Sequence, residues 1–168
     1  MIRNMKNVII ILLFSWICIS NTCKKVDSAN CHYSIEFSNN SEKKLRVRGT
    51  IHHPLGHPEP FDIEKLSYTA QAEMYIVNIG EQNNRSAMWS KDCHEIIFKR
   101  DTNYGTVFVY VFDAEVIENT SWDVVARDYL VLKRYDLTLE DLKRLDWKIT
   151  YPPAEAMKNV KQYPPYGE

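Results

Sequence analysis

The sequence predicts an α+β domain with a mostly antiparallel sheet, an N-terminal hairpin and two or three short helices. Segments in which apolar and polar residues alternate, as they do in strands, outnumber the segments with helical periodicity. The helical segments also come late in the chain, which favours an antiparallel sheet over a βαβ array. Aromatic residues make up 12% of the chain, so large apolar side chains are available for a core.

The chain begins with a segment that has the layout of an export signal. Arg3 and Lys6 precede an apolar run over residues 8–19 that is interrupted only by Ser15. A secretory signal has a basic start and an apolar stretch of roughly 7–15 residues, whereas a membrane-spanning helix needs roughly 20 apolar residues. We therefore expect residues 1–22 to be a signal peptide, with an uncleaved anchor or a buried helix as alternatives.

Cys23 would become the first residue if the signal were cut just before it, which is the arrangement of a bacterial lipoprotein. Acyl chains strengthen membrane binding by roughly 0.8 kcal/mol per buried CH₂. We therefore expect lipidation of Cys23 and a membrane-anchored protein in the periplasm or at the cell surface. Cys18 fits this role less well. Residues 20–22 lack the Leu that usually precedes such a cut, so soluble secretion after a cut near Ala29 is the alternative.

Charge argues against nucleic acid as a partner. The chain has a formal net charge of −1, and without residues 1–22, which carry two bases and no acids, the remainder carries −3. Proteins that bind nucleic acid usually have a basic patch and a high isoelectric point.

Cys31 and Cys93 remain after the expected cut. An unpaired exposed thiol is a liability in an oxidising compartment, so we expect a disulfide between them. Two separate buried cysteines are the alternative. The sequence has no C-x-x-C pair, which disfavours a zinc site.

The globular domain is expected to span residues 31–151, after a linker over 23–30. Residues 32–37 and 45–51 alternate in hydrophobicity around a turn cluster at 38–41, which predicts the hairpin. Residues 52–62 hold three of the seven prolines and predict a loop.

The middle of the domain is expected to contain a strand, a helix and a central strand. Residues 73–79 alternate like a strand, and residues 106–112 are apolar on both faces, which is typical of a strand covered on both sides. An amphipathic helical stripe is formed by Trp89, Cys93, Ile96 and Ile97. It would place Cys93 on the inward face, where it could meet Cys31.

The last third predicts two short helices and two strands. The helices are expected over 121–127 and 138–145 and the strands over 129–134 and 147–151. Thr138 and Asp141 resemble a capping box at the start of the second helix. Residues 152–168 are rich in proline and show no periodicity, so we expect a flexible tail.

Four motifs of this half resemble a known group of sequences. They are VFVYVFD at 107–113, SWD at 121–123, VLKRYDLTLEDL at 131–142 and WKITYP at 147–152. Together they resemble a family of uncharacterised secreted or lipoprotein-like proteins of Bacteroidota. The resemblance implies an envelope protein, and it brings no known activity, cofactor or catalytic residue.

The candidate metal ligands are His52, His53 and His57. Imidazoles bind zinc and copper, but adjacent residues of a strand point to opposite faces. We therefore expect a solvated loop and no cofactor.

Other catalytic constellations are weak. A serine hydrolase could be assembled from Ser121, His94 and Asp123, but no serine lies in a G-x-S-x-G motif. Asp113 ends a buried strand and is either an active-site acid or a turn cap.

The sequence therefore favours a non-enzymatic envelope module that binds a partner protein or a glycan, or that supports an assembly. The alternative is an extracytoplasmic hydrolase, or a metal-binding protein that uses the His52/His53/His57 loop.

Overall fold

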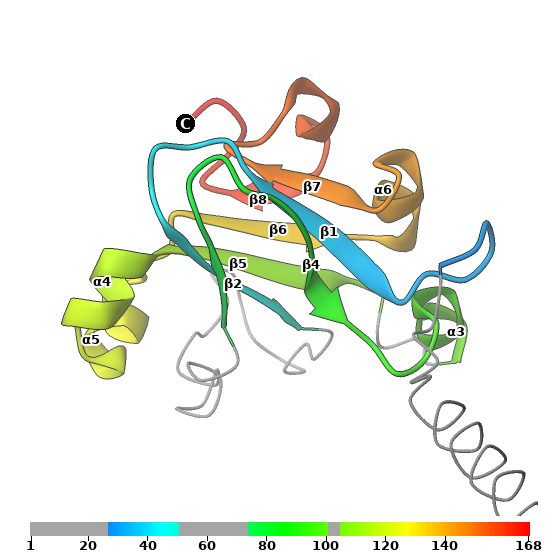
Figure 1. The fold of residues 1–168 in the computed structure, drawn as a ribbon, viewed down its shortest axis with the longest axis horizontal. Helices are drawn as coiled ribbons and strands as arrows, with labels where there is room; N and C mark the ends of the chain where they lie inside the picture. The colour runs from blue at the N-terminus through cyan, green and yellow to red at the C-terminus, as the bar shows by residue number, and fades with distance from the viewer. Residues whose placement is uncertain (1–26, 51–73, 101–104) are drawn as a thin grey trace, which may run out of the picture.

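The computed structural model describes residues 27–50, 74–100 and 105–168 (Figure 1). This part of the chain contains two sheets and four short helices. The predicted α+β class is confirmed.

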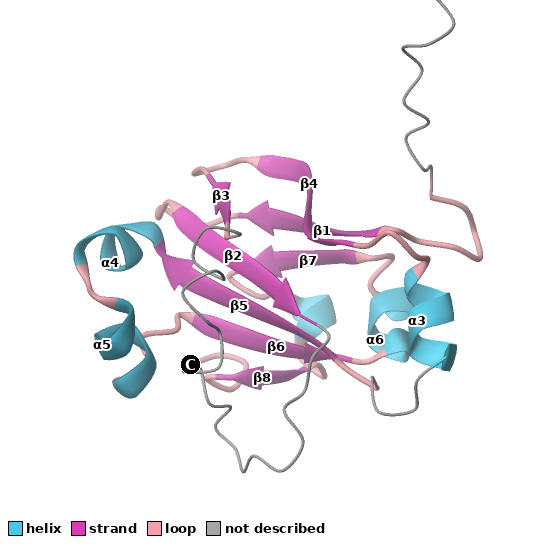
Figure 2. Ribbon diagram, turned by 90° about the horizontal axis from the view of Figure 1, so that it is seen from below, coloured by secondary structure: helices cyan, strands magenta, loops and turns pink. Residues whose placement is uncertain are grey.

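The larger sheet has five strands, and all of its neighbouring strands are antiparallel (Figure 2). Its order is β3 (Tyr75–Val77), β2 (Leu45–Thr50), β5 (Val107–Asp113), β6 (Lys133–Leu137) and β8 (Lys161–Tyr163). The central strand β5 is buried on both faces, as its apolar sequence predicts.

The smaller sheet has three strands. β1 (Ser34–Asn39) lies between β4 (Gln82–Trp89) and β7 (Lys148–Tyr151). β1 runs antiparallel to β4 and parallel to β7, so that Phe37 is opposite Ile149.

The two strands of the predicted hairpin form, but they do not pair with each other. β1 belongs to the small sheet and β2 to the large one. The buried side chain of Asn39 explains the divergence, because its amide donates to the carbonyl oxygens of Lys43 at 2.7 Å and Asn78 at 3.1 Å. Its Oδ1 accepts from the backbone N–H of Ser41 at 3.0 Å. These bonds stabilise a corner that leads the chain from one sheet into the other.

The main core fills the space between the two sheets. Apolar side chains from both sheets meet there, among them Phe37, Val47, Val109 and Ile149. A second cluster covers the other face of β5. It packs Phe108, Tyr110 and Phe112 against α5 (Trp122–Arg127) at the end where α4 (Ala114–Asn119) also lies (Figure 1).

The remaining helices lie at the opposite end of the large sheet. α3 (His94–Arg100) begins only after β4 has ended at Trp89, so the predicted stripe that joined Trp89 to Ile97 in one helix is wrong. α6 (Leu139–Arg144) has the predicted capping box, with both of its reciprocal bonds between Thr138 and Asp141.

The expectation of a flexible tail over residues 152–168 is corrected. A 3-10 helix, Glu155–Met157, and strand β8 belong to the fold, and Met157 and Val160 are buried in the main core. The ammonium of Lys133 donates to the carbonyl of Pro164 at 2.8 Å. The prolines flank β7 and β8 without interrupting them, which is why they are compatible with regular pairing.

Within the described ranges, no helix combines the length and the apolar character that a membrane crossing requires. The expected signal peptide at 1–22 and Cys23 lie outside these ranges.

Candidate functional site

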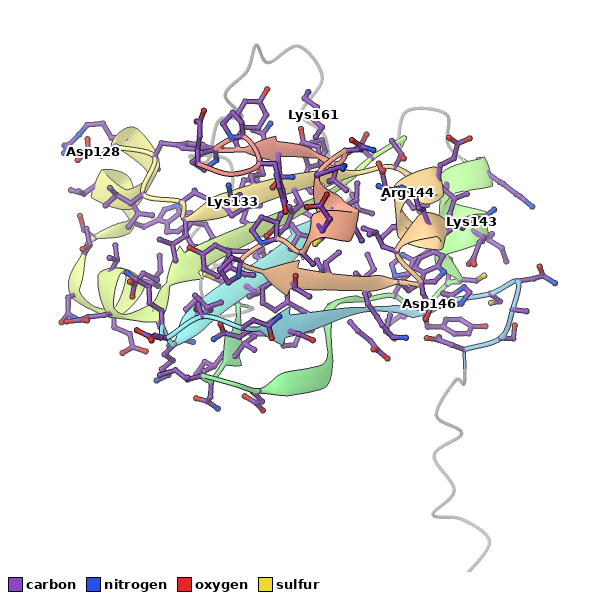
Figure 3. The ribbon with its side chains drawn as sticks, turned by 90° about the horizontal axis from the view of Figure 1, so that it is seen from above. Asp128, Lys133, Lys143, Arg144, Asp146 and Lys161 are labelled. Atoms are coloured by element: carbon purple, nitrogen blue, oxygen red, sulfur yellow. The ribbon has the colours of Figure 1, made fainter. Side chains whose placement is uncertain are left out.

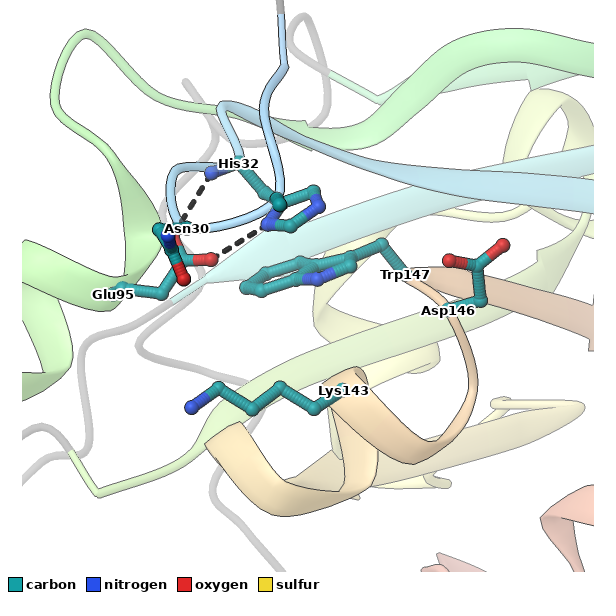
Figure 4. A pocket seen from close by; sticks show the side chains of 7 residues that line it. Asn30, His32, Glu95, Lys143, Asp146 and Trp147 are labelled. Atoms are coloured by element: carbon teal, nitrogen blue, oxygen red, sulfur yellow. Dashed lines mark hydrogen bonds and ion pairs between the residues drawn. The ribbon is translucent and has the colours of Figure 1, made fainter.

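A pocket of about 390 Å³ lies between the loop before β1, the start of α3 and the turn after α6 (Figure 4). Its walls are formed by seven residues, Ala29, Asn30, His32, Glu95, Lys143, Asp146 and Trp147. We call it the Trp147 pocket. Its volume falls within the range of small-molecule sites, roughly 300–1,000 Å³.

The loop before β1 is held in shape by its own polar groups. The Asp27 carboxylate accepts the backbone N–H of Tyr33 at 2.7 Å and the hydroxyl of Ser34 at 3.2 Å. Ser28 and Cys31 exchange backbone hydrogen bonds of 2.9 and 3.1 Å across a tight turn. The end of the expected linker is therefore ordered, and it fixes the position of His32.

The turn after α6 has an unusual backbone. Asp146 and Trp147 have φ angles of 52° and 59°. This left-handed conformation costs roughly 1–2 kcal/mol per residue for side chains other than glycine. The turn places the indole of Trp147, which is 5% exposed, under the loop before β1. Backbone strain of this kind is concentrated at functional sites, so the turn supports a functional reading of the pocket.

Two histidines stack on Trp147. The ring centroid of His32 lies 4.3 Å from that of Trp147 with an interplanar angle of 15°, and the His94 centroid lies at 5.6 Å. Trp147 is thus a packing residue. Trp122 is also a packing residue, since its ring centroid lies 6.0 Å from that of Phe112.

The carboxylate of Glu95 receives three donors. Its Oε1 lies 2.6 Å from His32 Nδ1, and its Oε2 accepts the His32 backbone N–H at 2.9 Å and the Cys93 thiol at 3.0 Å. Burial acts to raise the pKa of Glu95, but these hydrogen bonds outweigh it and lower the pKa from 4.5 to about 2. Glu95 is therefore ionised at neutral pH.

The charge of Glu95 fixes the tautomer of His32. An ionised carboxylate can only accept hydrogen bonds, so His32 Nδ1 must carry the proton. The other ring nitrogen, Nε2, has no protein partner within the part of the chain that the structure describes. A carboxylate that orients an imidazole in this way leaves Nε2 available to a ligand or to a proton.

Cys31 and Cys93 meet beside this pair, as the sequence predicts, but both are free thiols in the structure. Burial, together with the contacts to Cys31 and Glu95, raises the pKa of the Cys93 thiol to about 11. A thiol of this pKa stays protonated at neutral pH, so Cys93 is not an activated nucleophile.

The charged side chains around the pocket differ in whether they have a hydrogen-bond or ion-pair partner among the described residues. Asp146 pairs with Lys148 at 2.5 Å, and Arg144 is bonded to Asp141 at 2.9 Å and to the carbonyl of Ala156. Lys143, at the same end of the molecule (Figure 3), makes no side-chain ion pair or hydrogen bond within the described ranges.

The candidates for a hydrolase do not come together. His94, the first residue of α3, stacks on Trp147, whereas Ser121 and Asp123 belong to the opposite end of the large sheet at α5 (Figure 1). Asp113 caps α4 by accepting the Glu115 N–H at 3.0 Å, and it also pairs with Lys43 at 2.6 Å. Its role is thus the cap.

The remaining candidates lie outside the described residues, namely His52, His53 and His57. Among the residues that are described, no group of three histidine, cysteine or acidic side chains is arranged to hold a metal ion.

His32 and Glu95 were missed at the level of sequence, although a signal for them existed. His32 follows Cys31, and His94 and Glu95 follow Cys93. Once the two cysteines are expected to meet, their neighbours are expected to meet as well.

No family model, curated protein or solved structure matches this chain.

Proposed function

We propose that this chain is an exported cell-envelope protein, anchored by a lipid on Cys23, that binds a small ligand in the Trp147 pocket without catalysing a reaction. The layout of residues 1–22 supports export, and the motifs that resemble envelope proteins of Bacteroidota agree with it. A partner at this location would be another envelope protein, a glycan or a small solute.

The observation that carries the binding role is the construction of the pocket. A buried carboxylate orients His32 on the face of Trp147, and a turn with two left-handed residues brings Trp147 there. An imidazole that is held in one tautomer beside a cavity, with no described residue bonded to its Nε2, supports a binding role for this wall.

Charge indicates the chemistry of the ligand. Glu95 is matched by the donors of His32 and Asp146 by Lys148, whereas the Lys143 ammonium is left without a partner among the described residues. A cation that no described side chain compensates favours a small ligand with an anionic oxygen group, such as a carboxylate. A sugar stacked on Trp147 is disfavoured, because His32 already covers that ring.

The binding role is tested by NMR titration of the intact protein with acetate, and with acetamide as the neutral analogue of similar shape. Acetate is expected to shift the ring signals of His32 and Trp147, and acetamide is not. The Lys143→Met variant should bind acetate about tenfold more weakly, whereas Lys158→Met, at an exposed lysine paired with Glu155, should bind like wild type. Equal responses to acetate and acetamide would contradict the proposal.

A hydrolase is the second candidate, and it rests on the Glu95–His32 pair. An imidazole held by a carboxylate can act as a general base toward water. Ester hydrolysis that is lost in both His32→Ala and Glu95→Gln would favour this candidate over a binding protein.

We also propose that Cys31 and Cys93 form a disulfide in the exported protein, because their side chains already lie side by side. Mass spectrometry of the protein from membrane fractions tests this bond and the acylation of Cys23 together. A cytosolic protein with free thiols and an intact N-terminus would refute both.

A further inference from the structure

One carboxylate links the two cysteines to the pocket. Glu95 Oε2 accepts hydrogen bonds from the Cys93 thiol at 3.0 Å and from the His32 backbone at 2.9 Å. Its Oε1 holds the His32 ring at 2.6 Å. The same side chain therefore responds to the state of the thiol and to the state of the imidazole that faces the pocket.

The backbone already holds the two cysteine segments together. The N–H of His94 donates to the carbonyl of His32 at 2.8 Å, one residue away from each cysteine. Cys31 is half-buried and Cys93 is buried. Cys31 is therefore the thiol that an oxidant in solution reaches first.

We propose that the Cys31–Cys93 pair is a redox-sensitive switch that sets how Glu95 holds His32 at the Trp147 pocket. This inference rests on the proposed binding function of the pocket. The oxidant is a disulfide, either of a small molecule or of a protein. Cys31 attacks it as the thiolate, and a mixed disulfide forms while the first thiol leaves. Cys93 then displaces the second thiol, so two electrons and two protons pass to the oxidant.

Oxidation removes a donor from Glu95. The hydrogen of the Cys93 thiol is lost when the disulfide forms, so Oε2 keeps the His32 backbone N–H as its donor among the described residues. A carboxylate with fewer donors has a less stabilised negative charge. Oxidation does not alter the Lys143 side chain or the ion pair between Asp146 and Lys148. The oxidised protein should therefore present a more negative pocket wall and bind acetate more weakly.

The test compares the intact protein reduced with dithiothreitol and oxidised with glutathione disulfide, by NMR with ¹³C labels in glutamate and histidine. Oxidation is expected to shift the Glu95 carboxyl signal and the His32 ring signals, and to raise the pKa of Glu95. The acetate affinity should fall about fivefold, the effect of one hydrogen bond. Unchanged Glu95 and His32 signals, or a protein that does not lose two hydrogens on oxidation, would overturn the proposal.

Three variants separate the lost donor from the new bond. Cys31→Ala and Cys93→Ala both prevent the disulfide, but only the first keeps the Cys93 thiol. The Glu95 signal of Cys31→Ala should match the reduced protein under both reagents, and that of Cys93→Ala should move toward the oxidised protein. Cys93→Ser restores a donor and should return the signal to the reduced position. If Cys31→Ala and Cys93→Ala give the same Glu95 signal, the switch is refuted.

The outcome also distinguishes the switch from the proposed function. If the Glu95 and His32 signals follow the redox state but acetate binds in neither form, the switch of Glu95 and His32 is retained and the binding function fails. If acetate binds equally in both forms, the binding function is retained and the switch fails.

Discussion

At the scale of single residues, Glu95 concentrates the polar interactions of the pocket wall. Its side chain is 8% exposed, and it accepts hydrogen bonds from His32 and Cys93. A buried carboxylate is tolerated only when such partners compensate for the loss of water. Glu95 should therefore contribute to stability as well as to the pocket.

We expect Glu95→Gln to lower the free energy of unfolding near neutral pH by about 3 kcal/mol. The reason is that the pKa of the Glu95 carboxyl falls from 4.5 to about 2 on folding. Each pKa unit corresponds to about 1.4 kcal/mol. The folded state has the lower pKa, so the contribution is complete above pH 4.5 and is lost as the pH falls toward 2. Urea denaturation at several pH values measures both effects.

The control for this prediction is Glu140→Gln, at an exposed position of α6. We expect a change of no more than about 0.5 kcal/mol, as for most surface substitutions. If the stabilities of wild type and Glu95→Gln decline in parallel as the solution is acidified, Glu95 does not have the lowered pKa.

The sequence points to His32 and Glu95 only indirectly, through the cysteines that lie close to them in the chain. They lie 63 positions apart in the chain, and neither belongs to a recognised motif. The contact between Cys31 and Cys93 was predictable, because paired cysteines are the natural expectation for a chain that begins like an export signal. The left-handed turn at Asp146 and Trp147 was not, since neither residue is a glycine.

At the scale of elements, α6 determines where the pocket ends. Its capping box fixes the first turn, and the chain leaves its last turn into the left-handed residues that place Trp147. The backbone N–H of Trp147 also donates to the carbonyl of Leu142 at 2.8 Å. Any loss of order in this short helix should therefore reach the pocket.

Thr138→Ala tests this dependence. The Thr138 hydroxyl accepts the Asp141 N–H at 3.1 Å and donates to its carboxylate at 2.7 Å. Loss of such a cap costs about 1 kcal/mol, and the ring signals of Trp147 should broaden or shift. Thr138→Ser keeps the hydroxyl and should resemble wild type in urea denaturation and NMR. Equal stability of the two variants would show that the cap does not stabilise α6.

Met157→Ala tests the C-terminal segment. Met157 is 1% exposed in the main core, and its substitution should destabilise the protein by about 2–5 kcal/mol. Lys158→Ala changes the exposed neighbour and should cost much less. Thermal unfolding of both variants measures the difference, and similar melting temperatures would argue for a loosely attached tail.

Sequence patterns correctly predicted the elements that depend on residues close together in the chain. They failed for the elements whose pairing depends on contacts between distant segments. The α6 cap depends on residues three positions apart, and the burial of β5 depends on its own composition. By contrast, the partners of β1 lie in β4 and β7, so the turn at 38–41 could not reveal that β1 and β2 separate. The order of residues 155–163 likewise depends on pairing with β6.

At the scale of the whole molecule, the proposed lipid anchor on Cys23 would hold the pocket at a membrane surface. We expect Cys23→Ala to abolish incorporation of a labelled fatty acid into the protein, because no other acylated cysteine is expected. Cys18→Ala should keep the label, since Cys18 lies within the expected signal. Gel fluorescence and mass spectrometry after metabolic labelling measure the result. Persistence of the label in Cys23→Ala would exclude lipidation at that residue.

The parallel pairing of β1 with β7 has a consequence for the order of folding. β1 lies near the start of the described chain and β7 near its end, so this contact has a high sequence separation. Contacts of this kind form late, because the loop between them must first be closed at an entropic cost. The same two regions supply His32 and Trp147. A chain that is still being synthesised therefore has no complete pocket, and the proposed ligand could bind only after β7 has joined β1.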